Sequence, residues 1–124
     1  MPVQRLSIDA LEMILSGQVK EAATCVVKFY SNNCHLCHNL REYYADISDY
    51  ERYSRLKFFA FNVDDHPQIE KTMKFSGVPS IVVIHTNIGN RRPTTRLLPE
   101  PEEPNDSTWY RVREITSFID REAL

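Results

Sequence analysis

The chain has 124 residues, of which 42% are hydrophobic and 26% charged, and its formal net charge is -2. This is the balance of one ordinary globular domain, and the small net charge excludes a broad positive field that would recruit nucleic acid or an anionic membrane. No run of about 18 apolar residues is present, so we expect no membrane-spanning helix. The first residues lack the pattern of a signal peptide, and three cysteines are a poor basis for a secreted disulfide framework. We therefore expect a single domain over residues 1–124, a monomer in a reducing, cytoplasmic compartment that binds neither nucleic acid nor membrane.

The first half of the chain alternates between strand and helix patterns. A helix is predicted between Ser7, which can cap it, and Gly17, which can end it, and a short strand over residues 3–6 precedes it. The β-branched and aromatic run Thr24–Tyr30 predicts a buried strand. A long helix is predicted from Cys34 onward, because apolar residues recur there every three or four positions. Its predicted apolar face consists of Leu36, Leu40, Tyr43, Ile47 and Tyr50.

Two further buried strands are predicted over residues 57–63 and Ser80–His85. Between them Asp65 can cap a short helix with Pro67 in its first turn. That helix would contain Ile69 and Met73.

The last part of the chain begins with a predicted edge strand over residues 94–98, joined to the preceding strand by a turn. Residues 99–106 are rich in proline and acid, which predicts an extended loop. Ser107 can then cap a final helix. Its predicted apolar face consists of Val112, Ile115, Phe118 and Ile119.

The order of these elements predicts the fold class. Strands separated by helices favour parallel pairing through right-handed crossovers, whereas the last two strands, joined by a turn, favour an antiparallel pair. We therefore expect an α/β sandwich with a mixed central β-sheet and helices on both faces.

The motif at residues 34–38 reads Cys-His-Leu-Cys-His, which fits a redox pair, half of a metal site or a haem attachment point. Cys34 follows a predicted strand and starts a predicted helix, where unpaired amides and the helix dipole favour a thiolate. We expect its pKa to lie below the free-cysteine value of about 8.5. Cys37 lies one turn further along, within reach for a disulfide and shielded by the helix. This arrangement has one exposed attacking thiol and one resolving thiol, as thiol–disulfide exchange requires.

A strand, then "FYSNNCHLC", then a long helix, and later "GVPS" leading into a strand, resembles the thioredoxin family from about Ser7 to Phe118. The resemblance implies a thioredoxin fold and a thiol–disulfide oxidoreductase. Such an enzyme would exchange a dithiol and a disulfide at Cys34 and Cys37 with disulfide-containing protein substrates, as a cytosolic disulfide reductase. It would need no cofactor and no metal, and a separate reductase would supply its electrons.

The resemblance also implies a substrate site. In this family the proline of the Gly-Val-Pro motif is cis and faces the cysteine pair, so the Val78–Pro79 bond is expected to be cis. The backbone of Val78 would then offer an edge on which an extended peptide lies. Asn33 and Leu36, on either side of the first cysteine, complete the expected substrate-binding set.

Four residues depart from the pattern of the family. Asn33 replaces a tryptophan, His35-Leu36 replaces Gly-Pro, and Lys28 aligns with the buried aspartate that assists proton transfer in thioredoxins. Lys28 is expected either to lie near the thiols, where it would stabilise a thiolate and burial would lower its own pKa, or to extend to solvent and do neither. We favour the second alternative. A protonated His35 would stabilise the thiolate of Cys34 and make the disulfide more oxidising, unless solvent screens it.

Three other functions fit parts of the sequence. Residues 34–38 also match a haem attachment motif, with His38 and Met73 as iron ligands, but the strand-rich pattern argues against it. A metal site within one chain lacks ligands, because no second Cys-x-x-Cys or pair of histidines completes a tetrahedron. Two chains could instead share a metal or iron–sulfur cluster through Cys34 and Cys37. A thioredoxin-like adaptor without catalysis also fits, because a fold does not fix an activity. The third cysteine, Cys25, is expected to be buried and inert.

A basic cluster precedes the acidic loop and suggests a second hypothesis about partners. It consists of Arg91, Arg92 and Arg96. In the family that the chain resembles, the loop before the last helix lies near the cysteine pair. These arginines would then steer an acidic partner toward the site.

Overall fold

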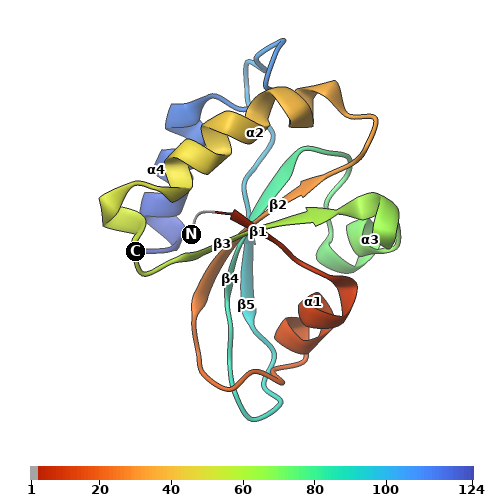
Figure 1. The fold of residues 1–124 in the computed structure, drawn as a ribbon, viewed down its shortest axis with the longest axis vertical. Helices are drawn as coiled ribbons and strands as arrows, with labels where there is room; N and C mark the ends of the chain where they lie inside the picture. Colours follow the sequence, from red (N-terminus) through yellow and green to blue (C-terminus); the bar gives the residue numbers. More distant parts are fainter. Residues whose placement is uncertain (1–2) are drawn as a thin grey trace.

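A five-stranded open sheet separates two pairs of helices in the computed structural model, which describes residues 3–124 (Figure 1). The strands are β1 (Val3–Arg5), β2 (Thr24–Tyr30), β3 (Lys57–Asn62), β4 (Ser80–His85) and β5 (Thr94–Leu97). The helices are α1 (Ile8–Leu15), α2 (His35–Ser48), α3 (Ile69–Met73) and α4 (Val112–Glu122). Two short 3-10 turns lie at Glu51–Tyr53 and Val63–Asp65. None of the helices in this range is long and apolar enough to cross a membrane.

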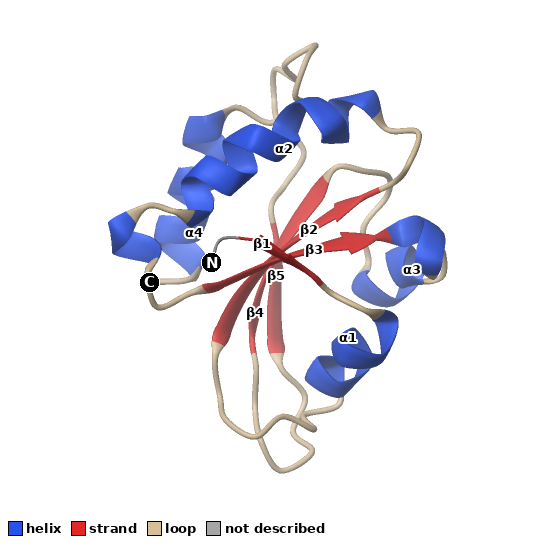
Figure 2. Cartoon of the chain, viewed as in Figure 1, coloured by secondary structure: helices blue, strands red, loops and turns tan. Residues whose placement is uncertain are grey.

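Helices α2 and α4 cover one face of the sheet, and α1 and α3 cover the other (Figure 2). Successive side chains of a strand point to opposite faces, so Val26 joins the core under α2 and α4 while Val27 joins the core under α1 and α3. Both side chains are fully buried. The α/β class with a mixed sheet and helices on both faces is therefore confirmed.

The strand order is β1-β3-β2-β4-β5, with β1, β3 and β2 parallel and β4 antiparallel to both neighbours. The prediction that β4 would be parallel is wrong. Helix α3 has 5 residues, which span only about 7.5 Å, so it cannot carry the chain back along the sheet. The chain enters β4 at the end of the sheet where β3 finishes, and β4 has to run in the opposite direction.

The first two helices begin where the sequence predicted, but the buried face of α2 differs. Ser7 caps α1 by accepting a hydrogen bond from Ala10 N at 3.1 Å. In α2, Tyr44 is 1% exposed and Tyr43 is 50% exposed, so the prediction of Tyr43 in the apolar face is wrong. The Tyr44 hydroxyl lies 2.9 Å from the carbonyl oxygens of Val26 and Phe59, contacts that a sequence pattern does not reveal. The helix ends at Ser48, before the predicted Tyr50.

Two predicted helix caps are also wrong. Asp65 ends the 3-10 turn after β3 and pairs with Arg5 at 2.7 Å, whereas α3 begins only after Gln68. Ser107 lies in a turn held by Asn105, whose Oδ1 accepts from Ser107 N at 2.9 Å. The chain makes an extra bend there before α4 starts.

Helix α4 is capped four residues later than predicted. Its N-cap is Arg111, whose backbone N–H donates to Glu114 Oε1 at 2.7 Å. Residues 99–106 contain no helix or strand beyond an isolated bridge between Asn105 and Trp109, as the loop prediction required.

Candidate functional site

The two cysteines of the Cys-His-Leu-Cys motif lie at the start of α2. Cys34 is the N-cap of this helix, and it is joined to Cys37 in a disulfide with a Cα–Cα distance of 5.2 Å. Cys37 N–H donates to Cys34 Sγ at 3.0 Å, so a helix-end amide is aimed at this sulfur. Cys34 is partly exposed and Cys37 is 2% exposed. Cys34 is the more accessible of the two residues, which is the asymmetry that exchange through a mixed disulfide needs.

The Val78–Pro79 bond is cis, as the resemblance implied. Because β4 starts at the end of the sheet where β2 finishes, this loop faces the start of α2, and Cys34 Sγ lies 3.8 Å from Val78 O. Two hydrogen bonds stabilise this loop. Gly77 N–H donates to Glu70 Oε1 at 2.6 Å, and Ser80 Oγ donates to Gly77 O at 2.8 Å.

A small polar network positions the segment before Cys34, and sequence reasoning missed it. Asn62 is 6% exposed and donates to Asn32 Oδ1 at 2.8 Å. Asn32 N–H in turn donates to Asp64 Oδ2 at 2.8 Å, and Asn32 O lies 3.0 Å from His38 Nε2. These contacts fix the path of the chain into α2 and therefore the place of Cys34.

A groove of about 260 Å³ runs beside the cysteine pair, and part of its wall comes from the loop before α4. The predicted residues Leu36, Val78 and Pro79 line it together with residues that were not predicted. The additional lining residues include Glu100, Trp109 and Tyr110. The signal that could have found this wall is Trp109, the one tryptophan of the chain. Asn33 is exposed and does not line this groove.

The expectation that Arg91, Arg92 and Arg96 lie near the cysteine pair is wrong. Arg96 lies in β5, where it pairs with Val83, and its Nε is 3.8 Å from Glu122 Oε1. Arg91 and Arg92 lie in the turn between β4 and β5, at the end of the sheet where His85 pairs with Thr94 (Figure 1). The cysteine pair lies at the opposite end. The charged part of the loop that does reach the site is acidic, since Glu100 lines the groove.

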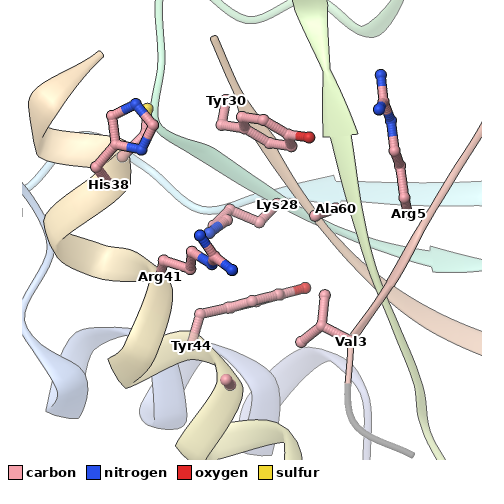
Figure 3. Close-up of a pocket in the computed structure, with 10 residues that line it drawn as sticks. Val3, Arg5, Lys28, Tyr30, His38, Arg41, Tyr44 and Ala60 are labelled. Carbon is pink, nitrogen blue, oxygen red and sulfur yellow. The ribbon is translucent and has the colours of Figure 1, made fainter. Parts of the chain in front are cut away.

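Lys28 is 4% exposed, so the favoured prediction that it extends to solvent is wrong. It lies in the central strand β2, between β3 and β4, and α2 covers it. Its ammonium group opens onto a cavity of about 480 Å³ that Cys37 also lines (Figure 3). Burial, together with the nearby positive charge of Arg41, lowers the pKa of Lys28 to about 8.

The remaining candidates from the sequence lie away from this chemistry. Cys25 is buried in β2, and burial raises the pKa of its thiol to about 11, which keeps it protonated. His38 is on α2, whereas Met73 packs against the core on the other face of the sheet, so the fold does not present them as two axial ligands of one haem. Within residues 3–124, three or more potential metal ligands do not gather at any point.

Comparison with known proteins agrees with this geometry. The family model for thioredoxin matches residues 12–97, more than half of the chain, and the chain belongs to the thioredoxin family. A comparison with curated protein sequences finds no match. The family and a cysteine pair at disulfide distance together support a thiol–disulfide oxidoreductase.

Solved structures agree on the fold. The thioredoxin Mala s 13 of Malassezia sympodialis is 18% identical with a TM-score of 0.68, and the match covers 100% of this chain and 96% of that one. The Trx4 domain of ERdj5 is 16% identical with a TM-score of 0.70, covering 100% and 99%. Chloroplastic thioredoxin z is 20% identical with a TM-score of 0.63, covering 98% and 94%. At these identities the likeness establishes the fold alone.

Proposed function

We propose that this chain reduces disulfides of protein substrates. The observation that carries the proposal is the unequal exposure of the two cysteines at a helix start, with the amide of Cys37 directed at Cys34 Sγ. In the reduced enzyme the Cys34 thiolate attacks one sulfur of the substrate disulfide, and the other substrate sulfur leaves as a thiolate. Cys37 then attacks the Cys34 sulfur of the mixed disulfide. The second substrate sulfur leaves as a thiolate. The enzyme now carries the Cys34–Cys37 disulfide, and its two electrons have reduced the substrate disulfide.

The substrate segment would lie along the loop that contains the cis bond. Val78 O is 3.8 Å from Cys34 Sγ and can accept a hydrogen bond from an extended backbone placed there. Leu36 and Pro79 would contact the substrate in the groove, and Asn33 would contact it at the exposed rim. Glu100 lines the same groove, so segments with a basic side chain next to the reacting cysteine suit it better than acidic ones.

Two residues would tune the reaction. His35 is exposed in the first turn of α2, and its protonated ring beside Cys34 would favour the thiolate and raise the reduction potential. Lys28 shares a cavity with Cys37, and its charged form would favour the thiolate of that residue. Electrons would come from a separate reductase, in a reducing cytoplasm where the chain acts as a monomer.

The test is the redox midpoint of the cysteine pair, measured by thiol alkylation across glutathione and dithiothreitol buffers. Cys25→Ala serves as the background, so that the third thiol does not contribute. A reversible two-electron midpoint near about -270 mV supports a reductase, whereas one between about -180 and -120 mV supports an oxidant or isomerase. Without any reversible couple the chain is not an oxidoreductase, and the adaptor alternative takes its place.

The same titration tests the tuning role of His35. We expect His35→Ala to make the midpoint more negative by about 10 to 20 mV, since an exposed charge pair contributes only a fraction of a kcal/mol. His66→Ala, in the turn after β3, is the matched control and should leave the midpoint unchanged. Equal midpoints for both variants would mean that solvent screens His35.

A further inference from the structure

The cavity behind the cysteine pair has an unusual charge balance. Its ten lining residues come from β1, β2, β3 and α2, and all of them lie in the described part of the chain. Three are Lys or Arg and none is acidic. Its volume of about 480 Å³ falls within the range of small-molecule sites. The lining residues are Val3, Arg5, Lys28, Tyr30, Cys37, His38, Arg41, Tyr44, Ala45 and Ala60.

Lys28 is the buried cation of this cavity. Between residues 3 and 124, no ion pair involves its ammonium group. Its Nζ lies 5.2 Å from the centroid of the Tyr44 ring and 5.8 Å from that of the Tyr30 ring. A buried ammonium without a carboxylate is costly, which is why burial lowers its pKa. Lys28 is 4% exposed as a whole residue, and its ammonium group, which has no ion pair among the described residues, lies at the cavity.

Arg41 supplies a second cation to the same space. Its guanidinium points toward Lys28 in Figure 3, and it also lacks an ion pair within the described residues. Arg5 differs, because its guanidinium is already bound to Asp65 at 2.7 Å. Two like charges that share a cavity repel each other, and an anion placed between them would remove this repulsion.

We propose that this cavity binds a small organic acid, whose carboxylate or phosphate group lies between Lys28 and Arg41. The planar guanidinium of Arg41 suits an oxyanion, and Lys28 adds a point charge at the buried end. The apolar body of the ligand would lie against Tyr30, Tyr44 and Val3. This site is distinct from the substrate groove at Val78, and the inference does not depend on the reductase activity.

Binding should depend on pH through the protonation of Lys28. An anion favours the ammonium form, so affinity should fall as pH rises through about 8, where the free site loses this charge. The groups that face Lys28 from the surrounding elements contain no acid that could replace the anion. They are Arg5 from β1, Tyr30 from its own strand, Ala60 from β3, and His38, Arg41 and Tyr44 from α2.

The experiment titrates the oxidised full chain with benzoate, phenyl phosphate and the neutral analogue benzamide, at constant ionic strength in chloride, and follows backbone amide shifts by NMR. We expect saturable shifts of cavity residues with an acid. Benzamide should bind at least about tenfold more weakly, because it lacks the charge. Benzoate binding without phenyl phosphate binding assigns a carboxylate, and the reverse assigns a phosphate ester.

Variants locate the site. Lys28→Met and Arg41→Gln should each weaken binding of the preferred acid by at least about tenfold, whereas Lys57→Met and Arg113→Gln, which remove exposed cations elsewhere, should not. Arg41 is exposed, so its variant keeps the test valid if Lys28→Met disturbs the fold. The proposal is overturned if neither acid gives saturable shifts, if benzamide binds equally well, or if both cavity variants bind as the wild type does.

Discussion

Replacement of the buried Lys28 by Met should stabilise the folded chain. Methionine is similar in length, carries no charge and tolerates irregular core space. In the folded protein Lys28 has a pKa of about 8 instead of its usual 10.5, because burial and Arg41 both oppose the ammonium form. The buried ammonium group of Lys28 therefore lowers the free energy of unfolding, and a methionine at this position does not.

The size and sign of this cost follow from the two pKa values. Below about pH 8 both states bind the proton, and the full penalty of about 3 kcal/mol applies to the folded state. As pH rises through about 8, the folded chain releases the proton while the unfolded chain keeps it until about 10.5, so the folded state gains stability. Between about pH 7 and pH 9 the wild type should gain about 1 kcal/mol relative to Lys28→Met.

Urea unfolding of the oxidised protein in chloride buffer measures this difference. The comparison is limited to pH values up to about 9. Above this pH the thiol of Cys25 ionises in the unfolded chain but stays protonated in the folded chain, where its pKa is about 11, and this favours the unfolded state. Lys57→Met removes an exposed strand lysine and should match the wild type at each pH. If Lys28→Met is less stable than the wild type, or if the two proteins change in parallel with pH, then burial does not disfavour the charge of Lys28.

Three other substitutions test separate parts of the structure. Tyr53→Phe removes a hydroxyl that lies 2.7 Å from Asp120 Oδ1 and 3.1 Å from Thr116 O on α4, and should lower the free energy of unfolding by about 1 kcal/mol in urea. Gly17→Ala should cost more than Gly89→Ala in thermal unfolding, although both residues have positive φ, because only at Gly17 would the added Cβ overlap the backbone of Arg91. Equal losses would contradict this. The ratio of kcat/KM between two model disulfide peptides, with Lys or Glu beside the cysteine, measures the role of Glu100. Glu100→Lys should shift this ratio by about twofold to fivefold in favour of the Glu peptide. An unchanged ratio would mean that Glu100 does not influence substrate choice.

Much of the fold could be predicted because the relevant forces act within a few residues. Strand β2 has the predicted bounds, since a β-branched and aromatic run favours a strand wherever it is buried. The capping of α1 by Ser7 is equally local. The direction of β4 was mispredicted, because it depends on the length of α3 and on which end of the sheet the chain has reached.

Part of the candidate site was also visible in the sequence. A cysteine between a strand and a helix has an exposed sulfur near helix-end amides, whatever the rest of the chain does. The Gly-Val-Pro motif pointed to the cis bond at Pro79 through the resemblance to the family. The wall formed by Glu100 and Trp109 was not visible, because the loop that carries them has no periodic pattern and its path is fixed by contacts with distant elements.

The sequence by itself determined the main elements, the place of the two cysteines at a helix start and the family. Only the tertiary structure decided which residues those elements cover. It buries Tyr44 instead of Tyr43, places Lys28 under α2 beside a cavity shared with Cys37, and carries Arg91 to the far end of the sheet. The physical reason is that propensity and capping act along a few neighbouring residues, whereas burial and charge environment depend on residues brought together from β1, β2, β3 and α2.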